Sequence, residues 1–366
     1  MAFAFADDLG PEKVVELYDP AFGLKAIIVV DNTAAGTAIG GTRMAPDVTL
    51  EECFGLARAM TYKNAAAGLP HGGAKSVIAA DPQMPTAEKE ALIRAFARGL
   101  REIVSYIPGP DMGTNEECMA WIRDEVGRSI GLPMELGGIP LDEIGATGFG
   151  LAIAAEVAEN YCDVRLKGAR VAVQGYGAVG YHAARFLVER GAVLVAAADS
   201  GGMIANPDGL DVEALRRLSL SGGSIGDHSE GQRHERDAIV AVDCDIWIPA
   251  ARPNVLTAAN VGDVKAKLIL QGANIPATPD AEAGLHERGI LNVPDFVANA
   301  GGVICGSVEY HGGTETGAFA AIREKIERNT DESLSRAKQS NAAPRAAAEA
   351  MARERIERAM SFRRSR

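Results

Sequence analysis

Two lysines, Lys63 and Lys75, stand in a run of small and largely apolar residues that extends from Met60 to Lys75. An ammonium group in such surroundings needs a partner or a task, because burying an unpaired charge is costly. The alanines and glycines around the lysines let backbone and substrate come close, and exclusion of water favours the neutral amine, which is a base. The segment therefore predicts a catalytic pair of lysines. The plain alternative is two surface lysines on a helix and a loop.

A second candidate group is Asp111, which lies in a turn rich in proline and glycine between Ile107 and Asn115. Its functional interpretation is a carboxylate that faces Lys75 and shuttles a proton. An aspartate just before a helix is also a common N-cap, and sequence spacing alone does not separate the two roles. His71 lies beside Lys75 as well, but the sequence assigns it no role.

A glycine-rich turn carries the third candidate site. Gly175, Gly177 and Gly180 form a GxGxxG pattern that follows an expected strand at 170–174 and opens an expected helix at 179–190. In this context the first glycine makes the tight turn, the second lets a pyrophosphate approach backbone N–H groups at the helix start, where Ala178 and Val179 lie, and the third lets helix and strand pack closely. We expect a dinucleotide-binding site here, with a purely structural turn as the alternative.

Asp199 ends the next expected strand and is the candidate ligand for the ribose hydroxyls. A carboxylate there disfavours a 2′-phosphate, so it favours NAD, with NADP as the alternative. Aspartates at strand ends are also common turn residues, which leaves a structural role open.

The elements that must position these groups follow an α/β pattern. A β-branched run over 24–31 predicts a buried strand, and helices are expected from Thr49 to about residue 60 and over about 86–103 and 115–130. Thr49 with Glu52 three residues later is a capping-box pattern. The stretch 131–150 is rich in glycine and proline and predicts a domain junction.

Beyond that junction the pattern becomes strand–helix–strand, with strands expected over 170–174, 192–198, 239–249 and 268–272. We therefore predict an α/β protein with an N-terminal α/β substrate domain, a Rossmann dinucleotide-binding domain and C-terminal helices that return to the first domain. The expected boundaries are 1–136, 137–325 and 326–366.

Composition limits the partners. The 366 residues carry a formal net charge of −12, which argues against a nucleic-acid partner, and no apolar run is long enough to cross a membrane. Five scattered cysteines without a metal-site spacing predict no metal centre and indicate a reducing, cytoplasmic setting.

Several motifs together resemble the glutamate/leucine/phenylalanine/valine dehydrogenase family, and they run in order over nearly the whole chain. The motifs are Gly40-Gly41-Thr42-Arg43-Met44, Tyr62-Lys63-Asn64, Gly72-Gly73-Ala74-Lys75, Pro110-Asp111-Met112-Gly113-Thr114-Asn115, Gly145-Ala146-Thr147-Gly148 and Asn299-Ala300-Gly301-Gly302-Val303. In length the chain resembles the leucine dehydrogenase branch more than the glutamate branch. The resemblance implies homo-oligomers, with the first domain taking part in assembly.

The resemblance also implies roles in an oxidative deamination of an L-amino acid with NAD. Lys63 would hold the substrate α-carboxylate, Lys75 would be the base, and Asp111 would pass protons to and from the amino nitrogen. Gly40, Gly41, Asn299 and Val303 match positions near the substrate, while Thr147 and Asn274 match positions that hold the nicotinamide carboxamide. Lys63, a permanent cation, would disfavour a second charge on Lys75 and so support its role as a base. The reaction would occur in a cleft that closes between the two domains.

Two departures from the family pattern bear on the substrate. Where glutamate enzymes place a lysine just before the Gly-Gly pair, this chain has Ile39, and where they place a serine three residues past Val303, it has Gly306. Desolvating a γ-carboxylate without a partner is costly, so we expect an apolar L-amino acid, branched-chain or aromatic. Gly109 and Gly306 are expected to leave room for a bulky side chain. The alternatives are glutamate or another polar amino acid and, in a different class, a non-catalytic NAD sensor.

Overall fold

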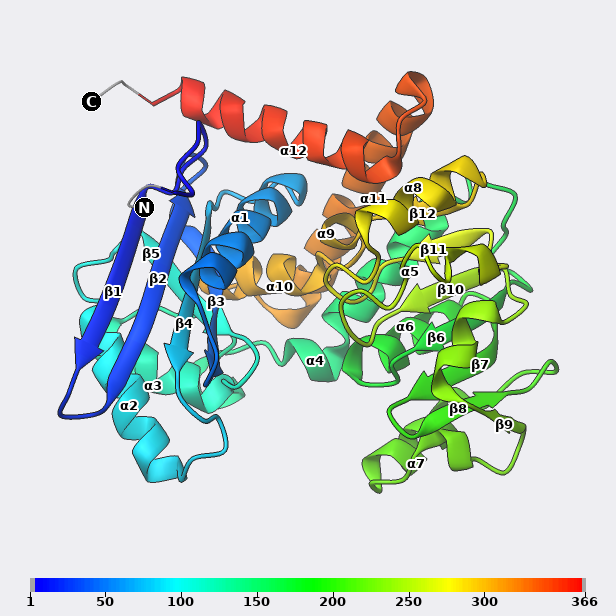
Figure 1. The fold of residues 1–366 in the computed structure, drawn as a ribbon, viewed down its shortest axis with the longest axis horizontal. Coiled ribbons are helices and arrows are strands. Elements are labelled where there is room, and N and C mark those ends of the chain that lie inside the picture. Colours follow the sequence, from blue (N-terminus) through cyan, green and yellow to red (C-terminus); the bar gives the residue numbers. More distant parts are fainter. Residues whose placement is uncertain (1–3, 364–366) are drawn as a thin grey trace. The chain divides into compact units, whose positions relative to one another are not determined.

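The computed structural model describes residues 4–363 and divides the chain into two compact units. Unit 1 comprises Met1–Pro140, Val303–Ala318 and Glu349–Arg366, and unit 2 comprises Leu141–Gly302 and Phe319–Ala348. Both units contain a sheet with helices packed on it, so the chain is an α/β protein (Figure 1).

The sheet of unit 1 has the strand order β1-β2-β4-β3-β5. Strands β1, β2 and β4 pair antiparallel, whereas β3 runs parallel to both β4 and β5. The bounds are β1 Lys13–Asp19, β2 Leu24–Asn32, β3 Ala38–Ala45, β4 Gly73–Ala79 and β5 Tyr106–Pro110. Because β3, β4 and β5 are parallel, residues at their carboxyl ends meet at one edge of the sheet.

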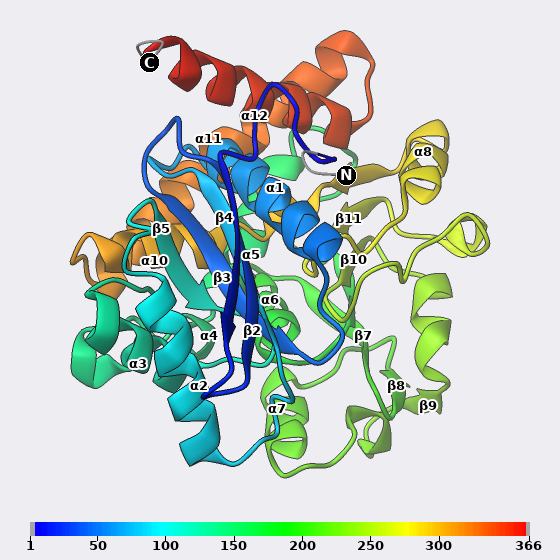
Figure 2. The same ribbon diagram turned by 60° about the vertical axis from the view of Figure 1, so that its left-hand side comes forward.

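Helices cover the two faces of this sheet differently. On one face, α2 (Thr86–Gly99) and α3 (Glu116–Val126) contribute Phe96 and Met119 to a core that also holds Ile28, Met44 and Ile78 from the strands. On the other face, α1 (Leu50–Ala66) packs on β2 and β4 (Figure 2). The hydroxyl of Thr49 accepts a hydrogen bond from the Glu52 amide at 3.1 Å, as the capping pattern predicts.

Unit 2 contains a seven-stranded sheet of order β12-β11-β10-β6-β7-β8-β9, in which β12 to β7 are parallel. The strands are β6 Arg170–Gln174, β7 Val193–Asp199, β8 Gly202–Ala205, β9 Gln232–His234, β10 Ile246–Pro249, β11 Leu268–Leu270 and β12 Leu291–Val293. The helices that lie wholly within unit 2 are α4 Leu141–Ile144, α5 Ala146–Ala158, α6 Ala178–Val188, α7 Val212–Leu220, α8 Pro279–Glu287 and α9 Asp295–Ala298. The parallel strands with a helix after β6 form the expected Rossmann-type arrangement.

Three helices contain the boundaries between the units: α10 Gly301–Tyr310, α11 Glu315–Ser340 and α12 Pro344–Ser361. Two predicted domain boundaries differ from the structure: residues 303–318 are predicted in the dinucleotide domain, and 326–348 are predicted among the helices that return to the first domain. Residues 303–318 belong to unit 1, and 319–348 belong to unit 2. A linear pattern shows that a helix has an apolar face but not which core buries it.

Two expected elements are shorter than predicted. The helix expected over 115–130 ends at Val126, where Gly127 takes the left-handed conformation with φ 74°, so Ile130 lies outside it. The strand expected over 239–249 begins only at Ile246, after a 3₁₀ segment at Arg236–Ala241. Other 3₁₀ segments are Met134–Leu136, Ile225–Asp227 and Val261–Asp263.

Within residues 4–363, no helix is both long enough and apolar enough to cross a membrane.

A half-buried arginine links three elements of unit 2. The Arg345 guanidinium lies 2.6 Å from the Glu282 carboxylate on α8 and 2.7 Å from the Asp295 carboxylate on α9, and it donates to the Gln271 side chain at 2.9 Å. Both carboxylates are nearly buried. Removing the arginine would leave two negative charges without their partner, which costs about 3–5 kcal/mol at a buried site.

We therefore expect Arg345→Ala to lower the thermal midpoint by at least about 5 °C, measured by differential scanning calorimetry. The matched control is Arg236→Ala, because Arg236 is exposed and pairs with its sequence neighbour Asp237. The control should stay close to wild type. Equal midpoints for the two variants would contradict the importance assigned to the Arg345 cluster.

Candidate active site

The face of the first sheet that α1 covers only in part carries the candidate chemistry. Side chains alternate along a strand, so Ile39, Gly41 and Arg43 of β3 share one face. A Cβ atom at Gly41 would lie 2.8 Å from the Asp111 Cβ and 3.0 Å from the Lys75 Nζ. Gly41 is therefore the position at which β3 makes room for both groups, and Lys75 of β4 lies on this same face.

Asp111 joins two cations. Its Oδ2 lies 2.8 Å from the Lys75 Nζ and 2.9 Å from the Arg43 Nε, and Arg43 also pairs with Glu52 of α1 at 2.5 Å. The Lys75 side chain is only 7% exposed and that of Asp111 is 24% exposed. Burial alone would raise the pKa of Asp111, but the Lys75 ammonium and the Arg43 guanidinium outweigh it and hold the pKa below its usual value. The carboxylate is thus ionised throughout the neutral range.

The N-cap of α3 is Asn115 and not Asp111. The Asn115 side chain accepts from the Cys118 amide at 3.1 Å, and the Asp111 amide donates to Thr114 Oγ1 at 3.0 Å. The structure therefore excludes the alternative in which Asp111 is a helix cap, and it leaves the carboxylate free to face Lys75.

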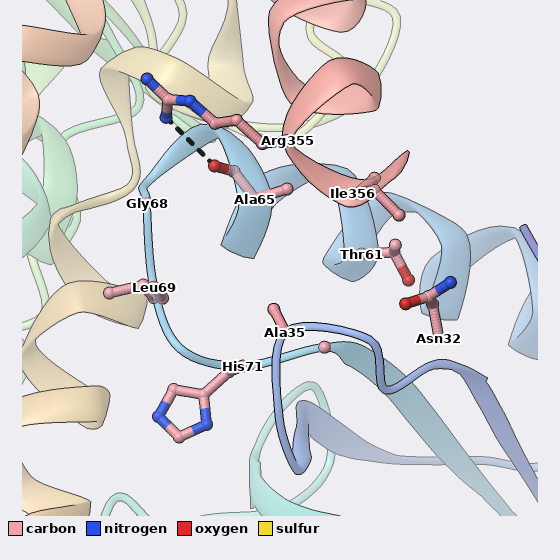
Figure 3. Close-up of a pocket in the computed structure, with 10 residues that line it drawn as sticks. Asn32, Ala35, Thr61, Ala65, Gly68, Leu69, His71, Arg355 and Ile356 are labelled. Atoms are coloured by element: carbon pink, nitrogen blue, oxygen red, sulfur yellow. Dashed lines mark hydrogen bonds between the residues drawn. The ribbon is translucent and has the colours of Figure 1, made fainter. Parts of the chain in front are cut away.

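Lys63 lies in the last turn of α1 and is partly buried. Helix α12 contacts this turn through Arg355, whose guanidinium donates to the carbonyls of Ala65 at 3.1 Å and Ala66 at 2.8 Å (Figure 3). A cation at the carbonyls of a helix C-terminus stabilises the helix end. A cavity of about 240 Å³ adjoins this turn and the loop that leads through His71 to β4 (Figure 3).

His71 is a buried link between two segments of unit 1. One ring nitrogen, Nδ1, lies 3.0 Å from the Thr37 carbonyl, and Nε2 lies 3.1 Å from Ser307 Oγ on α10. Since a carbonyl only accepts, Nδ1 carries the proton and Nε2 accepts from the serine. Burial lowers the pKa of His71, which keeps the ring neutral at neutral pH. The histidine therefore positions the loop between the two lysines.

An apolar wall adjoins the charged groups. Ile39, Ile107 and Ile130 form one buried cluster. A Cβ at Gly109 would lie 2.9 Å from Ile130 Cγ1, and one at Gly306 would lie 2.8 Å from Ile130 Cδ1. Ile130 therefore occupies the space into which a Cβ of either glycine would project, and the expectation that Gly109 and Gly306 leave room for a bulky side chain stays a prediction.

In the Gly40-Gly41 pair, Gly41 faces the site and Gly40 does not. A Cβ at Gly40 would lie 1.6 Å from the Ala74 carbonyl oxygen of β4, on the opposite face of β3 from Gly41. Gly40 therefore lets two strands approach closely, and its predicted contact with substrate could involve only its backbone. Val303 is half-buried at the start of the α10 portion that belongs to unit 1.

The glycine turn of unit 2 fits a dinucleotide. Gly175 has φ 92°, and a Cβ there would meet the Ala251 backbone at 2.7 Å. A Cβ at Gly180 would lie 1.9 Å from the Gly175 carbonyl oxygen, so this glycine permits the close packing of α6. At Gly177, in contrast, no atom of the described residues lies within 4 Å of the ideal Cβ, apart from the glycine and its chain neighbours. Open space at the N-terminus of α6, where Ala178 and Val179 begin the helix, suits a pyrophosphate.

Asp199 is already engaged by its own unit. Its Oδ1 accepts from the Gly201 amide and the Ser224 hydroxyl, each at 2.8 Å, and its Oδ2 accepts from the Ile225 amide at 2.8 Å. The carboxylate thus organises the loop beside β7. The structure supports a turn role for Asp199 and leaves its role toward a ribose as a prediction.

Asn299 and Asn274 lie together in unit 2. The Asn299 amide group donates to Asn274 Oδ1 at 3.2 Å and to the Gly272 carbonyl at 3.2 Å. Its Oδ1 is buried and has no partner among the described residues. Thr147 at the start of α5 is close as well, because its Oγ1 lies 3.1 Å from the ideal Cβ of Gly302. An unsatisfied buried acceptor fits a site that receives a polar ligand group.

Sequence reasoning missed two residues of unit 1. Arg43 belongs to a recognised motif but was given no task, although it is the second cation on Asp111. Ile130 was placed in a helix, where its contact with Gly109 and Gly306 is invisible. The positive charge of Arg43, together with the acidic turn at Asp111, could have indicated an ion pair. No local sequence pattern indicates the contacts of Ile130.

Comparison with known families accounts for nearly the whole chain. A model described as Glutamate/Leucine/Phenylalanine/Valine dehydrogenase matches residues 137–364, and one described as Glu/Leu/Phe/Val dehydrogenase, dimerisation domain, matches residues 11–128. Residues 129–136, between the two matches, lie just before the boundary between Pro140 and Leu141.

Curated relatives carry the name glutamate dehydrogenase. The enzyme from Aeropyrum pernix is 39% identical over 318 residues, covering 82% of this chain and 76% of the relative. An NADP-specific enzyme from Saccharolobus shibatae is 40% identical over 292 residues, covering 76% and 69%. An NAD-specific enzyme from Staphylococcus aureus is 37% identical over 315 residues, covering 81% and 76%.

Solved structures of the same fold include a glutamate dehydrogenase and an L-tryptophan dehydrogenase. A hetero-hexameric glutamate dehydrogenase from Thermus thermophilus in a leucine-bound form superposes with a TM-score of 0.87 at 31% identity, covering 97% of this chain and 91% of the other. An L-tryptophan dehydrogenase from Nostoc punctiforme gives 0.77 at 28% identity, covering 98% and 100%. This chain therefore belongs to the Glutamate/Leucine/Phenylalanine/Valine dehydrogenase family and is an NAD(P)-dependent amino acid dehydrogenase that acts on a CH–NH2 group.

Proposed function

We propose that this dehydrogenase catalyses the reversible oxidative deamination of an apolar L-amino acid to its 2-oxo acid and ammonia. The observation that carries the substrate class is the apolar wall beside Lys75 and Asp111. Ile39 is 2% exposed and packs with Ile107 and Ile130, while Gly306 adds no polar group. A substrate γ-carboxylate against this wall would lose its hydration without gaining a cation, which is costly.

Three side chains of unit 1 divide the binding and proton transfer. Lys63 holds the substrate α-carboxylate, and Asp111 takes a proton from the amino group. Because Asp111 and Lys75 are hydrogen-bonded at 2.8 Å, a proton can pass directly between them. Arg43 keeps the Asp111 carboxylate oriented through its own 2.9 Å contact.

Bound NAD(P) supplies the acceptor for the hydride that leaves the substrate Cα. Lys75 loses its own proton to solvent when substrate binds beside the Lys63 cation, and as the neutral amine it then removes a proton from a water molecule, whose oxygen forms a bond to the iminium carbon of the oxidised substrate. Asp111 returns a proton to the nitrogen of the resulting carbinolamine and the C–N bond breaks. The carbinolamine hydroxyl gives its proton to the Asp111 carboxylate so released, and ammonia leaves with the 2-oxo acid. Thr147, Asn274 and Asn299 of unit 2 would hold the nicotinamide carboxamide and the adjoining substrate.

Glutamate is the second candidate substrate, and a specific finding favours it. Relatives at 37–40% identity over most of the chain are named glutamate dehydrogenase, so the comparisons support glutamate better than an apolar amino acid. Against it stand Ile39 and Gly306 at the two predicted side-chain anchors. We further propose that the protein forms a homo-oligomer, because the N-terminal match is described as a dimerisation domain. A cytoplasmic location stays a prediction.

Initial rates with a panel of L-amino acids decide between the substrates. We expect kcat/KM for leucine, isoleucine or valine to exceed that for glutamate by at least about tenfold, because each lost carboxylate contact costs more than 1.4 kcal/mol. NADH or NADPH formation is followed by absorbance. Glutamate as the best substrate would refute the apolar proposal and establish the second candidate.

Lys75→Ala tests the base. Loss of a positioned general base should reduce kcat/KM by about 10²- to 10⁴-fold. Dinucleotide binding, measured by fluorescence, should persist because the glycine turn lies in unit 2. The exposed Lys25 on the same sheet supplies the control variant Lys25→Ala. Wild-type rates in the Lys75 variant would show that the lysine is not the base, and no turnover by the wild type with any amino acid would favour a non-catalytic NAD sensor.

Asp199→Ala tests the cofactor preference. If the carboxylate contacts the ribose, the ratio of kcat/KM with NADP to that with NAD should rise by about tenfold or more. Ser224→Ala is the control, because it removes one internal partner of Asp199 but keeps the charge. A ratio that changes equally in both variants would mean that Asp199 only organises its loop.

A further inference from the structure

Ile130 occupies the space between two elements that face the proposed side-chain pocket. Its atoms lie 2.9 Å from the ideal Cβ of Gly109 on β5 and 2.8 Å from that of Gly306 on α10. It also packs with Ile39, which lies two residues before Gly41 on the face that carries Lys75. Ile130 is therefore the side chain common to three positions predicted to contact substrate.

Hydrogen bonds fix the backbone on the N-terminal side of Ile130. The Arg128 guanidinium donates to the carbonyls of Leu100 at 2.7 Å, Tyr106 at 2.9 Å and Ile103 at 3.0 Å. The Ile130 amide donates to the Pro108 carbonyl at 2.9 Å. The segment is thereby fastened to β5 directly beside Gly109.

A buried carboxylate fixes the C-terminal side. Glu309 Oε1 accepts from the amides of Gly131 at 2.8 Å and Leu132 at 3.2 Å, and its Oε2 accepts from the Ile139 amide at 2.9 Å. Glu309 lies three residues after Gly306 on α10, so both face the same segment. The carboxylate therefore fixes the distance between α10 and Ile130.

This anchoring makes the wall stiff. Ile130 is 8% exposed, and a β-branched side chain has few rotamers available in a packed site. The glycines on either side cannot narrow the pocket, since they have no side chain. The volume open to a substrate side chain is then set by how far the isoleucine projects between them.

We propose that Ile130 is a specificity-determining residue that limits the length of the substrate side chain, and that Glu309 is a positioning residue that holds it in place. The inference rests on the proposed function for the location of the pocket. It does not depend on whether the substrate side chain is apolar or acidic, because it concerns size.

The test is the ratio of kcat/KM for a longer substrate to that for a shorter one. For an apolar enzyme the pair is phenylalanine and leucine, and for an acidic one it is 2-aminoadipate and glutamate. We expect Ile130→Ala to raise the ratio at least tenfold and Ile130→Val to raise it by a smaller factor. The control is Ile122→Ala, because Ile122 is fully buried in the core on the other face of the sheet.

The control should lower the thermal midpoint and leave the ratio unchanged. A ratio within threefold of wild type in the folded Ile130→Ala variant would overturn the inference. If Ile130→Ala does not fold, Ile130→Val is the test. A raised long-to-short ratio in that variant supports the inference, and an unchanged or lowered ratio overturns it. The wild-type panel tests the proposed apolar substrate separately, so a failure of that proposal is recognised before the size ratio is interpreted.

Glu309→Gln tests the positioning role. A glutamine amide cannot accept at its nitrogen, so one of the three backbone donors loses its partner. We expect the long-to-short ratio to rise two- to fivefold, with Glu315→Gln on the exposed start of α11 as the control. A lowered thermal midpoint with an unchanged ratio would show that Glu309 is only structural.

Discussion

The Asp111 carboxylate, shared between Lys75 and Arg43, is the interaction on which the candidate site depends. Two cations can lie side by side in a largely buried place only if an anion between them offsets both their repulsion and their lost hydration. The three residues come from three neighbouring parallel strands, or from the turn after one of them. The strand order of unit 1 is thus what brings the charges together.

Glycine at position 41 makes this arrangement sterically possible. Any larger residue would place a Cβ within 3.0 Å of both the aspartate and the lysine nitrogen. The neighbouring Gly40 meets a different constraint, since it faces the Ala74 carbonyl of the adjacent strand. One Gly-Gly pair therefore serves two faces of a sheet, with chemistry on one and strand packing on the other.

Much of the fold was predictable because its signals are local. The Thr49 cap, the strand at 24–32 and the glycine turn after β6 depend on residues close in sequence, and each occurs where expected. The end of α3 was missed by a few residues, although Gly127 is a common helix terminator. The assignment of 303–318 to unit 1 was missed because it depends on which core buries an apolar helix face.

The sequence by itself determined the family, the α/β class and the identities of the reactive groups, since these follow from residue types at fixed spacing. Only the tertiary structure decided how those groups are paired. It showed Asp111 to be a partner of Lys75 and not a helix cap, and it placed Ile130 in the space into which a Cβ of Gly109 or Gly306 would project. The physical reason is that these contacts join segments far apart along the chain, and no local pattern specifies which distant atoms fill a space.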